Sequence, residues 1–136
     1  MIKFKDILFE QFTKSDIINL VKEVYPKIVK DLGGELKKVE VHSDIYTRLG
    51  AVGIEDLKAQ NNPSAEYDPE VNKIFIYSTA MDSVEEVIRS LLHEHTHTLQ
   101  DQKEFKRLYD QEGYEYSNHP FEKAALAAEN NWKKYI

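Results

Sequence analysis

Apolar side chains between residues 84 and 99 recur at intervals of three and four, the spacing that places them along one side of an α-helix. At about 100° per residue, they project into an arc centred about 190° from His93. His93 and His97 project on the opposite side, and Asp82 or Ser83 can cap the helix start. The pattern therefore predicts an amphipathic helix, with the apolar stripe Val84, Val87, Ile88, Leu91, Leu92, Thr98 and Leu99.

A second helical pattern occupies the first half of the chain. Thr13 can cap its start, and Gly33 and Gly34 can end it. Pro26 falls inside the pattern and predicts a kink or a break near Tyr25. The spacing indicates a helix that packs on the core through Ile17, Ile18, Val21, Val24, Ile28, Val29 and Leu32.

Three stretches have the patterns of short β-strands. Residues 36–42 alternate between apolar and polar side chains, which predicts a half-exposed strand with His42 on its polar side. Residues 65–67 and 73–77 flank a turn at 68–72 and predict a hairpin. The strand 73–77 has the strongest pattern, and such a strand can line a cleft and hold an extended peptide through its main chain. Between residues 43 and 64 the pattern predicts only a short helix from Asp44 to Leu49 and a polar connection.

The C-terminal third is expected to be helical. The helix of residues 84–99 is expected to continue past Gln100 toward Asp110, and Gly113 can end it. After a loop, Pro120 fits the first turn of a last helix. Its apolar side is rich in small side chains that permit close packing, namely Phe121, Ala124, Ala125, Ala128 and Trp132.

Together these patterns predict an α+β fold formed by one domain, residues 1–136. The expected parts are an N-terminal helix, a small and mostly antiparallel sheet, the helix of residues 84–99, and a C-terminal helix. A length of 136 residues is sufficient for one stable core.

Composition narrows the function classes. The net charge of −6 offers no surplus of basic residues for nucleic acid or for an anionic membrane surface, so neither is an expected partner. The N-terminus is interrupted by charged residues, and no apolar run reaches secretory or transmembrane length, which predicts a cytoplasmic protein. Cysteine is absent, so any metal site must use nitrogen and oxygen ligands.

The polar side of the helix 84–99 carries the motif H-E-x-x-H, formed by His93, Glu94 and His97. Two histidines four residues apart lie one turn apart on the same face and can bind one metal ion. Glu94 is then placed as a general base beside a metal-bound water. His95 projects into the middle of the apolar stripe and is expected to be a buried structural residue. A motif this short also occurs by chance on a solvated helix that happens to be rich in histidine.

A catalytic zinc site usually has three protein ligands and one open position, so a third ligand is needed. Glu122 and Glu129 on the last helix are candidates, and His119 lies just before it. The two glutamates share a face but lie about 10 Å apart along the helix axis, so only one can bind the ion.

The segments 93–100 and 116–125 resemble the small gluzincins, zinc metallopeptidases with the pattern H-E-x-x-H-x-x-Q followed by a tyrosine and N-P-x-E-x-x-A. The resemblance covers residues 65–132. It implies a zincin-like domain in which Zn²⁺ is bound by His93, His97 and Glu122, and in which Glu94 is the base. His119 stands where asparagine is usual. It is either a neutral change in the turn or a transition-state donor at the mouth of the cleft.

The resemblance implies hydrolysis of a peptide or protein substrate. Zinc would lower the pKa of a bound water to about 7, and Glu94 would take the proton and pass it to the leaving nitrogen. The oxyanion donor is expected in the loop before the last helix, from Tyr116, Tyr114 or His119. Larger gluzincins often have an aspartate four residues after the third ligand that orients a ligand histidine. Here that position is Leu126, so another residue must supply any such contact.

Two other interpretations fit the same residues. In one, zinc joins the helix of His93 to the last helix in a non-catalytic binding or regulatory module. In the other, a polar helix serves an interaction protein that binds no metal. The retention of Glu94 favours chemistry, because a purely structural site needs no base beside its ligands.

Overall fold

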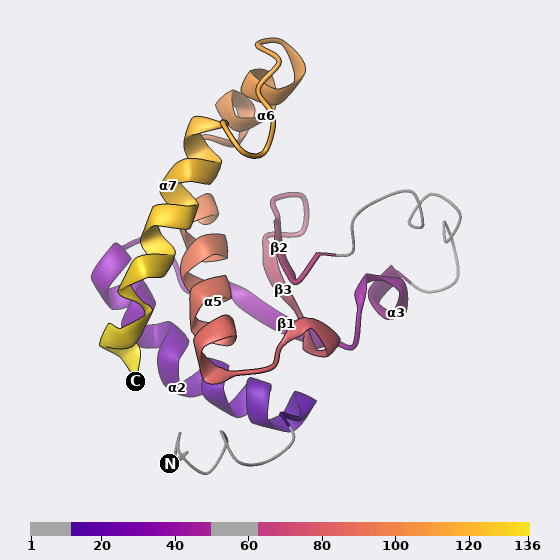
Figure 1. Ribbon diagram of the computed structural model, residues 1–136, viewed down its shortest axis with the longest axis vertical. Coiled ribbons are helices and arrows are strands. Elements are labelled where there is room, and N and C mark those ends of the chain that lie inside the picture. Colours follow the sequence, from indigo (N-terminus) through magenta and orange to yellow (C-terminus); the bar gives the residue numbers. More distant parts are fainter. Residues whose placement is uncertain (1–11, 50–62) are drawn as a thin grey trace.

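The computed structural model describes residues 12–49 and 63–136, and in these ranges helices α2, α5 and α7 lie on one side of a small sheet, with α3 on the other (Figure 1). This arrangement is the α+β architecture that the sequence predicted. The helices are α2 (Lys14–Leu32), α3 (Ile45–Leu49), α5 (Val84–Thr98), α6 (Gln102–Asp110) and α7 (Pro120–Ala128), with 3-10 turns η1 (Ser78–Ala80) and η2 (Glu129–Tyr135). The strands are β1 (Lys38–His42), β2 (Ala65–Asp68) and β3 (Lys73–Tyr77).

The sheet has the strand order β1-β3-β2. β2 and β3 form the predicted antiparallel hairpin, in which Ala65 faces Ile76 and Asp68 faces Lys73. β1 pairs with β3 in parallel, so the sheet is mixed where a mostly antiparallel one was expected. β3 lies between two strands and has no free edge for a peptide. Of these strands, β2 is the one whose outer edge borders the candidate site described below.

Alternate side chains of β3 enter two different clusters. Ile74 and Ile76 join the main core, which also contains the apolar sides of α2 and α5. Phe75 and Tyr77 point the other way and pack with Ile45 of α3. This period of two is the geometry of a strand covered on both faces. The fully buried members of the main core include Ile17, Leu20, Val24, Ile28, Ile74, Ile76, Val87, Ile88 and Leu91.

The predicted ends of α2 are confirmed. Thr13 and Asp16 cap each other's backbone N–H groups, and the N–H of Gly33 donates to the carbonyl of Val29. Gly33 has a φ of 86°, a conformation that glycine adopts without strain. The helix continues through Pro26, so the break considered near Tyr25 does not occur.

The helix that carries the motif ends earlier than predicted. α5 stops at Thr98, and α6 begins after Asp101, whose carboxylate accepts from the N–H groups of Lys103 and Glu104. The side-chain amide of Gln102 then donates to the carbonyl of His97 in the last turn of α5 and to that of Gln100 just after it. These caps satisfy the groups left by two helix ends, so the chain turns here instead of continuing as one helix.

Figure 1 shows α6 and the loop after it at one end of the molecule, beyond the start of α7. Within the described ranges, the chain contains no helix with the length and apolar character needed to cross a membrane. The polar connection that was expected between α3 and β2 falls mostly at residues 50–62, outside the described residues.

Candidate metal centre

α5 presents the three residues of the H-E-x-x-H motif on the side that faces β2 and α7. Ser83 caps the helix by accepting from the N–H of Glu86, as predicted from its position. His93, Glu94 and His97 are all buried, although they are polar. Buried polar groups require partners, so the motif is not the solvated helix face of the chance interpretation.

α7 supplies the third member of the cluster. Pro120 stands in its first turn, which places Glu122 near the helix start. Oε1 of Glu122 lies 2.7 Å from Nε2 of His97 and 3.4 Å from Nε2 of His93. The three side chains are buried, and their ligand atoms lie within 4.8 Å of one another, close enough to hold one metal ion.

While both imidazoles are neutral, the hydrogen bonds around this cluster remain incomplete. The side-chain amide of Gln100 donates to the carbonyl of Phe121, so its Oε1 must accept from Nδ1–H of His97. Nδ1 of His93 likewise donates to Oε2 of Glu129 at 2.7 Å. Each neutral imidazole then has only a lone pair at Nε2.

Both of these lone pairs face a carboxylate oxygen. Oε1 of Glu122 is buried and lacks any hydrogen-bonding partner within the described part of the chain. Three electron-pair donors that converge in a buried space require a positive charge between them. Two nitrogens and one carboxylate oxygen are donors that suit zinc and other divalent metals, so these residues fit a metal ion.

The pKa values of the two histidines show the same requirement. Burial opposes a charge on His93, but the close carboxylates of Glu122 and Glu129 outweigh it and raise its pKa to about 10. On His97 as well, burial opposes a positive charge and Glu122 favours it, and the pKa is again raised. Burial alone would raise the pKa of Glu122, but the two imidazoles lower it well below its usual range. Without a metal ion, protons on the imidazoles supply the missing positive charge.

α5 and the chain from α7 into η2 run in opposite directions. His97 therefore meets Glu122, and His93, one turn back, meets Glu129. The two outer contacts, Glu129 to His93 and Gln100 to His97, fix both imidazole rings with Nε2 directed inward. Glu129 thus supplies the orienting contact that Leu126 cannot make.

Glu94 lies beside the cluster without belonging to it. Burial raises the pKa of its carboxyl group, and the imidazoles of His93 and His97, together with the backbone N–H of Tyr67 in β2, partly oppose this. A carboxylate with a raised pKa at a buried position has the properties of a general base. Its position next to the two histidines is the one that the motif predicted.

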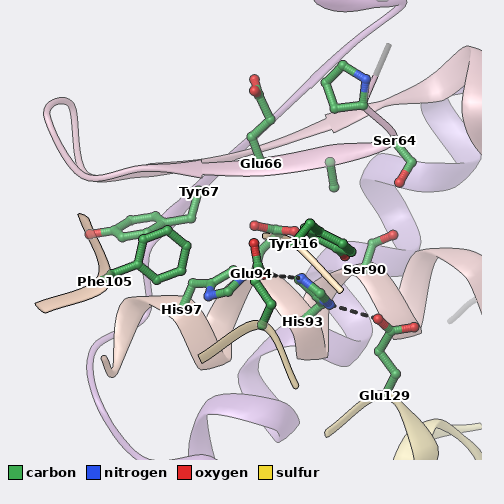
Figure 2. A pocket seen from close by; sticks show the side chains of 13 residues that line it. Ser64, Glu66, Tyr67, Ser90, His93, Glu94, His97, Phe105, Tyr116 and Glu129 are labelled. Atoms are coloured by element: carbon green, nitrogen blue, oxygen red, sulfur yellow. Dashed lines mark hydrogen bonds and ion pairs between the residues drawn. The ribbon is translucent and has the colours of Figure 1, made fainter. Parts of the chain in front are cut away.

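A pocket of about 600 Å³ opens in front of these residues. Figure 2 shows β2 passing above α5, with Glu66 pointing away from the helix and with His93, Glu94 and His97 below the strand. The pocket is lined by Pro63, Ser64, Ala65, Glu66, Tyr67, Ser90, His93, Glu94, His97, Phe105, Tyr116, Glu122 and Glu129.

The predicted donors in the loop before α7 lie in different surroundings. Tyr116 lines the pocket, is about half exposed, and has a pKa raised by burial and by the nearby Glu122. Tyr114 is exposed and is not part of the pocket lining. His119 is fully buried, accepts from the N–H of Phe121 through Nδ1, and donates through Nε2 to the carbonyl of Phe105. Nδ1 thus caps α7 and Nε2 joins α7 to α6, which leaves neither nitrogen for a transition state and favours the neutral interpretation.

His95 is confirmed as a buried structural residue. Its Nδ1 accepts from the hydroxyl of Tyr25 at 2.8 Å, and its Nε2 donates to the carbonyl of Gly33 at 2.8 Å. Burial lowers its pKa, which keeps the imidazole neutral. The angular projection of the helix was the signal that separated this histidine from its two neighbours.

Sequence reasoning missed two residues of α6 that contact the cluster. The ring of Phe105 lies edge-on to the ring of His97, with 5.2 Å between centroids. The hydroxyl of Tyr109 donates to Oε2 of Glu122 at 3.0 Å. Phe105 and Tyr109 lie four residues apart, a spacing that predicts one face of a helix. The turn that brings α6 back toward α5 depends on tertiary packing, which this spacing does not predict.

Comparison with models of known protein families, with curated proteins and with solved structures finds no match to this chain. The function must therefore be argued from the site itself.

Proposed function

We propose that this protein is a zinc-dependent metallopeptidase with Glu94 as its base and His93, His97 and Glu122 as its metal ligands. The observation that carries the proposal is the buried Oε1 of Glu122, which faces two imidazole nitrogens and has no hydrogen-bonding partner among the described residues, with the carboxylate of Glu94 beside them. The resemblance of residues 93–100 and 116–125 to small gluzincins adds the reaction class.

The donor set favours zinc among divalent metals. Two imidazoles and one carboxylate form a three-ligand set typical of catalytic zinc sites, and such sites leave a position for water. Zinc bound there would polarise a carbonyl group and lower the pKa of water to about 7. Mg²⁺ and Ca²⁺ favour sites made only of oxygen ligands, which this one is not.

The role proposed for Glu94 follows from its burial and its raised pKa. In the carboxylate form it accepts a proton from the attacking water, and in the carboxyl form it gives that proton to the leaving amine. Gln100 and Glu129 hold the two imidazoles in place during this exchange. Tyr116, at the pocket wall, is the best placed of the predicted oxyanion donors.

The substrate proposed for this site is a peptide in extended conformation. Among the described strands, β2 is paired on one side only, and its residues Ala65, Glu66 and Tyr67 line the pocket. An extended chain can pair with such an edge through main-chain hydrogen bonds. Its scissile carbonyl would then pass in front of α5.

The test combines metal analysis with hydrolysis of an unbiased peptide library, with products identified by mass spectrometry. We expect about one zinc per chain in the wild type and much less in Glu122→Ala. Glu94→Gln should keep its zinc and lose about 10²- to 10⁴-fold in rate. Cleavage by Glu94→Gln at the wild-type rate would refute the assignment of the base.

Two other outcomes would refute the proposal as a whole. If the wild type bound zinc but cleaved no peptide, the ion would be a structural clamp between α5 and α7. If the wild type bound no divalent metal, the metal-free interaction protein would be the remaining interpretation.

A further inference from the structure

Tyr109 gives the two oxygens of Glu122 different surroundings. Its hydroxyl donates to Oε2 at 3.0 Å, whereas Oε1 faces the two imidazoles and has no hydrogen-bonding partner in the described part of the chain. A tyrosine hydroxyl carries its proton at neutral pH, so it acts here as the donor. One oxygen of the carboxylate thus accepts a hydrogen bond from Tyr109, and the other faces only the two imidazole nitrogens among the described residues.

The position of Tyr109 is set by a small aromatic cluster that packs against the metal ligands. Its ring lies 4.3 Å from that of His119 and 5.4 Å from that of Phe105, measured between centroids. Phe105 in turn contacts the ring of His97. The hydroxyl therefore reaches Glu122 from a side chain that is fixed by packing on two sides.

We propose that Tyr109 is a positioning residue that holds Oε2 of Glu122, so that Oε1 alone is presented to the metal ion. A carboxylate can bind a metal through one oxygen or through both. An oxygen that already accepts a hydrogen bond is a weaker ligand, so the contact favours binding through a single oxygen. The site then has three protein donor atoms and keeps a position for water.

This inference rests on the proposed function only for the identity of the metal site, and it requires no peptide cleavage. A merely structural role for Tyr109 is the competing explanation, because the same hydrogen bond also joins α6 to α7. The two roles predict different effects on a metal ion bound at the site. A structural tie changes stability alone, whereas a positioning contact changes the coordination of the ion.

The test compares Tyr109→Phe with Tyr114→Phe. Both changes remove one hydroxyl from a tyrosine whose ring contacts His119. Neither tyrosine lines the pocket, but the hydroxyl of Tyr109 donates to Glu122 and no such bond joins Tyr114 to Glu122, which makes Tyr114 a matched control. The measurements are the visible spectrum of the protein loaded with Co²⁺, the affinity for Zn²⁺ in competition with a chelator, and the melting temperature of the metal-free protein.

We expect Tyr109→Phe to bind zinc about 10- to 100-fold more weakly, the usual effect of losing a contact to a metal ligand. Its cobalt bands should weaken as the freed Oε2 joins the coordination shell and the ion moves away from tetrahedral geometry. Tyr114→Phe should match the wild type in both measurements. The proposal is overturned if Tyr109→Phe keeps the wild-type spectrum and affinity, whatever its melting temperature.

Failure of the proposed function gives a different result. A wild type that binds cobalt and zinc but hydrolyses no peptide would refute the peptidase and leave the spectral comparison decisive for Tyr109. A wild type that binds neither ion would overturn both proposals.

Discussion

The two sides of α5 both bury histidine, but only one side completes its hydrogen bonds. On the side of the main core, His95 accepts from Tyr25 and donates to Gly33, and both of its nitrogens are used. On the side of the pocket, His93 and His97 donate through Nδ1 and direct Nε2 at Oε1 of Glu122, a buried oxygen with no hydrogen-bonding partner in the described ranges.

The comparison separates structural from functional polar groups within one helix. A closed arrangement such as that of His95 is complete in the protein alone and contributes to stability. On the pocket side the arrangement is open, because the two neutral imidazoles offer no proton to Oε1 of Glu122. Such an arrangement lowers stability until a cation binds there. The pocket side is therefore expected to respond to added metal, and the core side is expected to be indifferent to it.

Addition of zinc to the metal-free protein should have the largest effect. At a free concentration 1,000 times the dissociation constant, binding to the native state alone stabilises it by about 4 kcal/mol. Denaturant unfolding with and without zinc measures this difference. A chelator should reverse the effect, and Glu122→Ala should lose most of it. If zinc left the wild-type transition unchanged, the open arrangement would need another explanation.

His95→Ala should lower the stability of the protein and leave zinc binding intact, the reverse of what is expected for Glu122→Ala. The change leaves a cavity and removes the partners of Tyr25 and Gly33, at a cost of about 2–4 kcal/mol in the free energy of unfolding. The folded variant should still bind about one zinc per chain. His42→Ala is the control, since this histidine is partly exposed on β1 and pairs with Glu40. Loss of zinc binding in a well-folded His95→Ala would contradict the division between the two sides.

This division could be predicted from the sequence because it depends on a single helix. The angular positions of His93, His95 and His97 follow from helix geometry alone. The spacing of apolar residues likewise predicted α2, α7 and the β2–β3 hairpin. The prediction of Glu122 as a metal ligand also depended on the need for a third ligand and on the resemblance to known motifs.

Features that depend on how two elements meet could not be predicted in this way. Glu129 was considered as a metal ligand, but the opposite directions of α5 and η2 place it at the outer nitrogen of His93. Phe105 would lie roughly 12 Å along the axis from His97 in one continuous helix. The turn after Thr98 instead brings their rings to 5.2 Å. The spacing of residues within one element predicts neither the relative direction of two helices nor the angle between them.

Glu129→Ala tests the contact that sequence reasoning misplaced. It leaves Nδ1 of His93 without its acceptor, and we expect a 10- to 100-fold weaker affinity for zinc. Glu85→Ala is a matched control, because Glu85 also contacts Arg89 but does not contact a histidine of the site. Chelator competition measures both affinities. Equal affinities in the two variants would show that Glu129 does not orient His93.

Tyr25→Phe should have the smallest effect of this series, and it isolates one hydrogen bond on the core side of α5. The change removes the donor at 2.8 Å from Nδ1 of His95, which leaves the hydroxyl of Thr98 at 3.5 Å, and it leaves the N–H of Lys37 without its acceptor. We expect a loss of about 1–2 kcal/mol in the free energy of unfolding, with zinc affinity unchanged within about twofold. Tyr67→Phe is the control, since the hydroxyl of Tyr67 donates to Asn72 in an exposed turn. A Tyr25→Phe variant that lost zinc affinity in proportion to its stability would mean that the two sides of α5 are coupled.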